Sequence, residues 1–285
     1  MTRKFRKIVV IGTGLIGGSI CKALMKKQLV EEVVGVCRRE SSLERALKER
    51  AITRGFVNSY PEALKGAEAV FIATPVHTIK DVFESLADTV DSSDVIVSDV
   101  GSTKREIVLA AGKFSDRFSF VGAHPLAGSE KTGVEHSCAE LFEDSVCVLT
   151  PERSTSADAR GKIKMLWQEM GATVVELSPG EHDEYLAYTS HLPHAAAFAL
   201  VNALEEKIPQ QMVSSGFRDT TRIAASDPAL WSDIFMTNRD NVLGSIKRYK
   251  KMLESIEKAL RENDRGQLER LLEEARRKRD EIVQE

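Results

Sequence analysis

Seven short apolar runs rich in valine and isoleucine recur through the first 177 residues, each four or five residues long. Runs that are apolar throughout at this length are typical of strands covered on both faces. Between most of them lie stretches with apolar residues at helical spacing, such as Ile79, Val82, Phe83 and Leu86. Alternating strands and helices predict an α/β fold with a Rossmann-type, doubly wound and mainly parallel sheet. The runs cover residues 8–11, 33–37, 69–73, 95–98, 118–122, 146–149 and 173–176.

The character of the chain changes near Ser178, where the strand pattern stops and helical periodicity begins. Pro193 is expected to kink or interrupt a long helix over residues 185–204, because proline cannot donate a backbone hydrogen bond. The sequence therefore predicts a Rossmann-like domain (1–178), of the kind that binds dinucleotides, followed by an all-helical domain (179–285). Strongly amphipathic helices with little else to pack on often pair between chains, so we expect a homodimer through the helical domain.

A glycine-rich loop follows the first predicted strand and opens a helix, with glycines at positions 12, 14 and 17. In this Gly-x-Gly-x-x-Gly spacing the glycines allow a tight turn, close approach of a pyrophosphate and close packing of helix on strand. The free N–H groups at the start of the helix then attract the anion. Thr74 and Pro75 follow a later strand and are expected at the nicotinamide end. The loop residues expected to bind the dinucleotide are Gly12, Thr13, Gly14, Leu15, Ile16 and Gly17.

The tip of the second predicted strand bears on the choice of cofactor. NAD enzymes place a carboxylate there to hold the ribose 2′-hydroxyl, but this chain has Cys37, followed by Arg38, Arg39 and two serines. Guanidinium and hydroxyl groups can bind a 2′-phosphate, so we predict NADP as the cofactor. The alternative is that both arginines are solvated, with Arg38 stacking on adenine, and that the enzyme uses NAD or both.

Composition excludes several classes of partner. Lys and Arg number 40 against 43 Asp and Glu, without a basic block, so we expect no nucleic acid partner. No apolar run approaches the roughly 20 residues that cross a bilayer, so we expect no membrane partner. The four cysteines form no Cys-x-x-Cys pair, which predicts free thiols in the cytoplasm and neither disulfides nor a zinc site.

Polar residues gather where two predicted strands end, at 98–104 and 122–131. His124 stands there between a small residue and a proline, where it has no evident capping or packing role, and an imidazole can accept a proton near neutral pH. We therefore predict that His124 is catalytic. His191 and His194 have the spacing of a metal pair, but no third ligand is suggested, so we predict no metal site. The other histidines, His77, His136 and His182, are interpreted as structural or exposed.

Four segments resemble the signatures of the prephenate and arogenate dehydrogenase family of tyrosine biosynthesis. They occur in the family's order and, with the glycine loop, span nearly the whole chain. They are the Asp-Val-Gly-Ser-Thr-Lys run at 99–104, the His-Pro-Leu-Ala-Gly run at 124–128, the Ser-His-Leu-Pro-His run at 190–194 and the Asp-Thr-Thr-Arg-Ile-Ala run at 219–224, followed by Trp231. The resemblance implies oxidative decarboxylation of prephenate to 4-hydroxyphenylpyruvate, with hydride transfer to NAD or NADP.

The resemblance also implies roles for individual residues. His124 would hydrogen-bond the hydroxyl group on the substrate ring, and Ser102 would orient that histidine near the nicotinamide. Arg222 would bind a substrate carboxylate, for which a planar guanidinium is well suited. The further substrate-binding residues implied are His191, Trp231, Ser129 and Glu130, with Glu130 at a polar gate.

Other functions stay open on the sequence alone. Arogenate is the close alternative substrate, because an amino group replaces the side-chain keto group. A reductase for imines or hydroxy acids would keep the fold, and a dinucleotide sensor would not need His124. The chain ends at Glu285, directly after the helical part, so we expect neither a regulatory domain nor a fused chorismate mutase.

Overall fold

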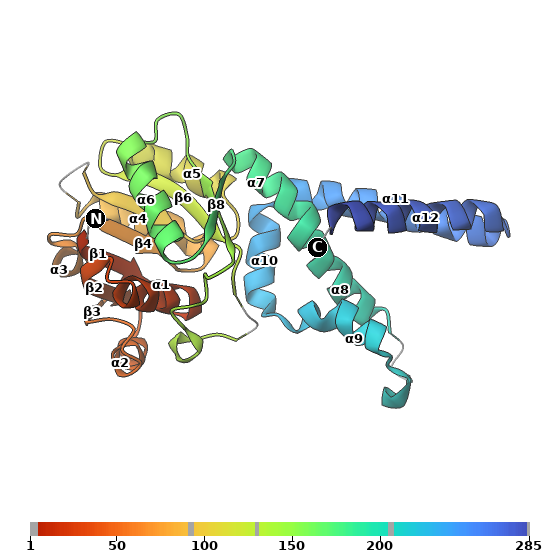
Figure 1. Ribbon diagram of the computed structural model, residues 1–285, viewed down its shortest axis with the longest axis horizontal. Helices are drawn as coiled ribbons and strands as arrows, with labels where there is room; N and C mark the ends of the chain where they lie inside the picture. The colour runs from red at the N-terminus through yellow and green to blue at the C-terminus, as the bar shows by residue number, and fades with distance from the viewer. Residues whose placement is uncertain (1–4, 91–93, 129–130, 205–207, 284–285) are drawn as a thin grey trace. The chain divides into compact units, whose positions relative to one another are not determined.

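The computed structural model describes residues 5–90, 94–128, 131–204 and 208–283, and it divides into two units, 1–238 and 239–285. The first unit holds a sheet with the strand order β3-β2-β1-β4-β5-β6-β7-β8 (Figure 1). All neighbouring strands pair in parallel except β6 and β7, which are antiparallel. The doubly wound, mainly parallel sheet is thus confirmed. Its strands are β1 (Phe5–Ile11), β2 (Val30–Cys37), β3 (Arg54–Val57), β4 (Ala69–Ile72), β5 (Ile96–Asp99), β6 (Ser119–Pro125), β7 (Val146–Thr150) and β8 (Thr173–Glu176).

Helices cover both faces of the sheet, which explains why the central parts of most strands are apolar. In β1, Ile8 and Val10 belong to one buried cluster, whereas Val9 and Ile11 belong to another. The first cluster includes side chains of α1 (Leu15–Lys26), α2 (Glu40–Lys48) and α6 (Ala157–Glu169). The second includes side chains of α3 (Tyr60–Leu64), α4 (Ile79–Ala87) and α5 (Arg105–Ala111).

The strand β3 was not predicted, because it lies at an edge of the sheet and is only partly covered. Its short sequence begins with Arg54 and Gly55, which interrupt any apolar run. An edge strand needs one covered face at most, so its sequence signal is weak.

The strand β6 extends further than predicted. Its first residues pair with β5 as far as Val121, and its last four pair with the antiparallel β7, where His124 lies opposite Val148. Pairing with β7 therefore carries His124 beyond the end of β5 on a regular strand.

Among the described residues of the first unit, four α-helices and a π-helical turn follow the sheet, together with two short 3-10 helices. Ser178 caps the first of them in a reciprocal arrangement with Glu181, in which each side chain accepts the other's backbone N–H. The predicted interruption at Pro193 is confirmed, since a π-helical turn (Ala187–His191) precedes the helix that carries it. The helices are α7 (Pro179–Leu186), α8 (Leu192–Asn202), α9 (Ser215–Thr221) and α10 (Pro228–Thr237).

The second unit consists of two helices, α11 (Arg239–Arg261) and α12 (Arg265–Ile282). A short turn separates them, and the Asp264 side chain caps α12 by accepting the N–H of Gln267 at 2.9 Å. The predicted boundary after Ser178 marks where strands give way to helices, and as a domain boundary it stays a prediction. Among the described residues, no helix is long and apolar enough to span a membrane.

Candidate active site

A cavity of about 540 Å³ opens at the carboxyl ends of β1, β2 and β4. The strand order reverses direction between β1 and β4, and such switch points are where open α/β sheets bind ligands. The predicted cofactor residues that line this cavity are Gly12, Thr13, Gly14, Cys37, Arg38, Thr74 and Pro75.

The glycines of the loop have the geometry that a dinucleotide requires. Gly12 has a φ of +90°, and a side chain there would collide with the Ala73 carbonyl. At Gly17 an added Cβ would meet the Gly12 carbonyl, whereas at Gly14 it would meet open space. Gly14 therefore leaves room for close approach of a phosphate, and a dinucleotide fits the loop.

Arginine side chains are among the residues that line the cavity. Arg38, Ser42 and Arg45 line it, and Arg45 also lies 3.4 Å from the Glu135 carboxylate. The buried Cys37 Sγ lies 3.0 Å from the hydroxyl of Thr13. Cys37 therefore joins β2 to the glycine loop. The predicted cofactor residues that do not line the cavity are Leu15, Ile16 and Gly17, in the first turn of α1, and Arg39, the N-cap of α2. Their roles stay predictions.

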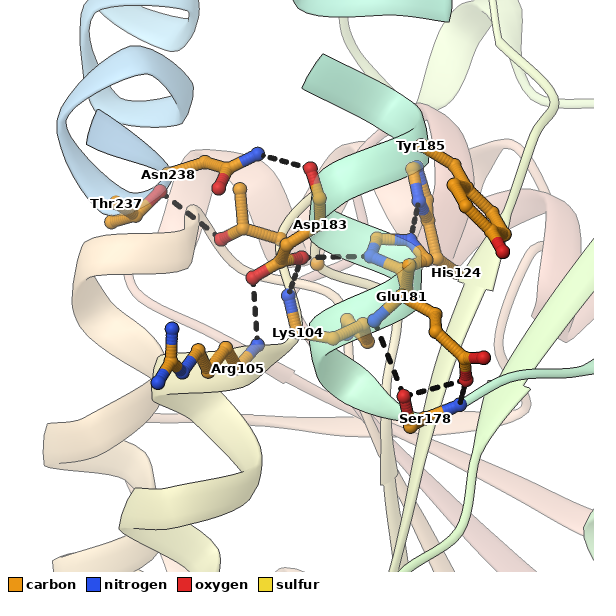
Figure 2. A network of polar contacts seen from close by, with 12 residues as sticks. Lys104, Arg105, His124, Ser178, Glu181, Asp183, Tyr185, Thr237 and Asn238 are labelled. Atoms are coloured by element: carbon orange, nitrogen blue, oxygen red, sulfur yellow. Dashed lines mark hydrogen bonds and ion pairs between the residues drawn. The ribbon is translucent and has the colours of Figure 1, made fainter. Parts of the chain in front are cut away.

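A second group of polar residues is centred on His124. Its Nδ1 lies 2.8 Å from Nε2 of His182, which comes from α7 and is fully buried (Figure 2). Burial holds the pKa of His124 well below its ordinary value of 6.5, and the nearby His182, Lys104 and His191 lower it further. His124 is therefore a neutral base at physiological pH.

His182 is in turn bonded to its neighbour in sequence. Its Nδ1 lies 2.8 Å from Oδ1 of Asp183. The same carboxylate accepts the backbone N–H groups of Lys104 at 2.7 Å and Arg105 at 2.9 Å, where α5 begins. Burial also lowers the pKa of His182, although Asp183 opposes this shift.

A buried ion pair supports the strand that carries His124. Lys104 and Asp99 are both fully buried and bonded to each other. The Lys104 ammonium donates to the carbonyl of Ala123 at 2.8 Å, and the Asp99 carboxylate accepts the Ala123 N–H at 3.2 Å. The ion pair therefore holds both backbone polar groups of the residue that precedes His124.

His191 and Trp231 lie next to this group. His191 is buried, its Nδ1 lies 3.1 Å from the amide nitrogen of Asn238, and burial lowers its pKa to about 4. His194 stacks on Trp231 with ring centroids 3.4 Å apart. Burial lowers the pKa of His194, its hydrogen bond with the Ser190 carbonyl opposes this shift, and the positive charge of Arg222 adds to it. The described residues include no group of three or more potential metal ligands.

The predicted substrate residues are thus placed to different degrees. His191 and Trp231 approach each other, with ring centroids 6.1 Å apart, and Arg222 lies close enough to affect His194. Ser102 is on the loop between β5 and α5, and the described residues show no hydrogen bond between it and His124. Ser129 and Glu130 lie outside the described residues.

Two residues that contact the predicted site were missed from the sequence, His182 and Asp183. We interpreted His182 as structural or exposed, but it is buried and bonded to His124. A signal was present, because positions 182 and 183 lie one turn before the buried Leu186 and Ala187. That spacing places both polar side chains on the covered face of α7.

Comparison with known proteins identifies the family. The family model described as prephenate dehydrogenase, nucleotide-binding domain, matches residues 20–176, and the one described as prephenate dehydrogenase, dimerization domain, matches residues 178–274. Prephenate dehydrogenase of Bacillus subtilis (strain 168) is 35% identical over 279 residues, which cover 96% of this chain and 75% of that relative.

Solved structures agree with these matches. Prephenate dehydrogenase from A. aeolicus, in complex with hydroxyphenyl propionate and NAD+, aligns with a TM-score of 0.91 at 32% identity, over 99% of this chain and 100% of that one. Synechocystis arogenate dehydrogenase aligns with a TM-score of 0.84 at 29% identity, over 97% and 100%. Fold and site are those of a dehydrogenase that uses a nicotinamide dinucleotide. The chain belongs to the prephenate dehydrogenase family.

Proposed function

We propose that this protein catalyses the oxidative decarboxylation of prephenate to 4-hydroxyphenylpyruvate, a step of tyrosine biosynthesis. The observation that carries the proposal is the neutral His124, held by His182 beyond the end of a Rossmann-type sheet. Prephenate has a hydroxyl group and a hydrogen on C4 of its ring and a carboxylate across the ring at C1. Loss of hydride from C4 and of carbon dioxide from C1 makes the ring aromatic, so the reaction is effectively irreversible.

The residues of the site divide this work between them. His124 accepts a hydrogen bond from the C4 hydroxyl and takes its proton, as a neutral imidazole can. Arg222 binds a carboxylate of the substrate, because its guanidinium can donate two parallel hydrogen bonds. His191 and Trp231 line the substrate pocket, Ser102 orients His124, and these assignments rest on the family resemblance.

The cofactor is a nicotinamide dinucleotide, which when bound accepts the hydride. We propose that this chain prefers NADP. Arg38, Arg45 and Ser42 all line the cavity, and guanidinium and hydroxyl groups suit a 2′-phosphate. The A. aeolicus enzyme was solved with NAD+, so use of both dinucleotides is the alternative that the test must measure.

We also propose a homodimer through the helical residues, supported by the dimerization-domain match at 178–274. A cytoplasmic location stays a prediction, supported by the four cysteines, all of them free thiols.

The test is reduction of dinucleotide by purified protein, followed by absorbance, with prephenate or arogenate against NAD or NADP. We expect turnover with prephenate, and a higher kcat/KM with NADP than with NAD. Turnover with arogenate but not with prephenate would identify arogenate as the substrate. If all four mixtures are inactive while dinucleotide binds, the proposal is wrong.

A further inference from the structure

The Asp183 carboxylate sets the direction of the hydrogen bonds that lead to His124. Its two oxygens accept the backbone N–H groups of Lys104 and Arg105. An ionised carboxylate can only accept hydrogen bonds, so its contact with Nδ1 of His182 at 2.8 Å requires the proton to lie on that nitrogen.

The tautomers of both histidines then follow. A neutral imidazole has one N–H, and burial favours the neutral form of both rings by lowering the pKa of His182 and of His124. Because Nδ1 of His182 carries the proton, its Nε2 carries a lone pair. That nitrogen faces Nδ1 of His124 at 2.8 Å, so His124 donates and its own Nε2 is left with a free lone pair.

Solvent has no access to the middle of this chain. His182 has no exposed surface, and the Asp183 side chain is almost completely buried. No water can therefore take the place of either partner in their mutual hydrogen bond. His182, itself held by the Asp183 carboxylate, therefore fixes the orientation of the His124 ring. Hydrogen-bond partners of metal-bound histidines fix the orientation of those rings in the same way.

We propose that His182 and Asp183 are positioning residues that hold His124 with a free Nε2 lone pair and share the proton it takes from the substrate. The proton-sharing part rests on the proposed function. In that step the substrate O–H bond breaks, its electron pair stays on oxygen, and an N–H bond forms at Nε2 of His124. The proton on Nδ1 of His124 then shifts toward Nε2 of His182, so the positive charge lies beside the Asp183 carboxylate. Loss of carbon dioxide from C1 then leaves the product as a phenolate, which takes the proton back from Nε2 of His124, and the shift between the two histidines reverses.

Two substitutions separate the parts of this relay. Asp183→Asn removes the negative charge that stabilises a proton on His182, and whichever way its amide is turned, the NH2 group faces the backbone N–H of Lys104 or of Arg105. We expect kcat to fall about 10²- to 10⁴-fold, the range for loss of general base catalysis, with KM within about 3-fold. His182→Gln offers an amide oxygen that can accept from His124 but cannot take a proton, so kcat should fall about 10-fold or more. The matched control is His136→Gln, at an exposed position, which should leave kcat unchanged.

The deciding measurement is ¹⁵N NMR of histidine-labelled protein with bound dinucleotide at neutral pH, with His124 assigned by comparison with His124→Gln. We expect the Nδ1–H tautomer of His124 in the parent and in His182→Gln. An Nε2–H tautomer in the parent would overturn the proposal even if neither variant folds. Values of kcat within about 3-fold of the parent in both variants would overturn it as well. If the parent shows the expected tautomer but does not oxidise prephenate, the proposed function is wrong and the tautomer assignment stands.

Discussion

Nδ1 of His124 lies 2.8 Å from Nε2 of His182, so the histidine proposed as the base is hydrogen-bonded to one that has no contact with solvent. His124 comes from β6 and His182 from α7, 58 positions later in the sequence. The contact therefore exists only because the extended end of β6 meets the first turns of the helical segment. It links the strand that presents the base to the part of the chain that supplies the substrate residues.

Replacement of His124 should abolish turnover but preserve cofactor binding. In His124→Asn we expect kcat to fall about 10²- to 10⁴-fold, because the general base is lost. Dinucleotide affinity, measured by titration calorimetry, should stay within about 2-fold, since His124 does not line the cofactor cavity. His136→Asn serves as the control, and a His124→Asn enzyme as fast as the parent would exclude the role.

The pH dependence of kcat/KM should show the low pKa of His124. Protonation removes the free lone pair, so activity is lost as the pH falls through the pKa of the folded protein. Because burial holds that pKa well below 6.5, kcat/KM should be constant through pH 6.5 and decline only at lower pH. An acidic limb centred at or above pH 6.5 would contradict this.

The same experiment needs a stability control, because of His191. Its folded-state pKa of about 4 lies below the ordinary 6.5, so the unfolded state binds more protons between these values. Stability is therefore fully present above pH 6.5 and is lost as the pH falls toward 4, by about 2 kcal/mol at pH 5 from this residue alone. Urea unfolding of the parent and of His191→Gln at pH 7.5 and 5 should show a smaller decrease in the variant, and equal decreases would exclude His191 as the source.

Arg222 should affect the substrate and not the cofactor. Loss of a charge-assisted hydrogen bond in Arg222→Ala should raise KM for prephenate about 10- to 100-fold. Dinucleotide affinity should be unchanged, and Arg222→Lys should recover part of the loss. Lys113→Ala, an exposed cation elsewhere, is the control; an unchanged KM in Arg222→Ala would remove this residue from the site.

Arg38 should discriminate between the dinucleotides. In Arg38→Ala we expect affinity for NADP to fall about 10-fold more than affinity for NAD, because a guanidinium pairs strongly with a phosphate. Lys48→Ala, at the exposed end of α2, is the matched control for a nearby positive charge. Equal losses for NADP and NAD in Arg38→Ala would contradict the 2′-phosphate assignment.

Removing only the cation of the buried ion pair should strongly destabilise the protein. Lys104→Met leaves the Asp99 carboxylate buried without its cation, so we expect unfolding free energy to fall by about 3–5 kcal/mol. Adding Asp99→Asn should recover part of this loss. The control is Lys80→Met, which breaks an exposed pair with Glu106 and should cost less than about 1 kcal/mol. Similar losses of unfolding free energy in Lys104→Met and Lys80→Met would contradict this prediction.

Much of the fold could be predicted from the sequence, because strands covered on both faces must be apolar throughout. That rule detected seven strands, including β8 at one edge of the sheet, and missed β3 at the other edge, where Arg54 and Gly55 interrupt the apolar run. The glycine loop could also be predicted from the sequence, because the atoms around Gly12 and Gly17 leave no room for a side chain.

The surroundings of His124 could not be predicted in the same way. Lys104 is fully buried, against the usual behaviour of lysine, because Asp99 and the Ala123 carbonyl meet it in the folded chain. His182 was interpreted as structural or exposed, because the sequence alone does not show which residues meet the start of α7. Only the contact with a distant strand gives His182 its partner, His124.

The most direct test of the account is the stoichiometry of the reaction of the purified protein with prephenate. Reduced dinucleotide, measured by absorbance, and released carbon dioxide should form in a one-to-one ratio with 4-hydroxyphenylpyruvate, and His124→Asn should form none of them at a comparable rate. Binding of dinucleotide without release of carbon dioxide from prephenate would contradict the account.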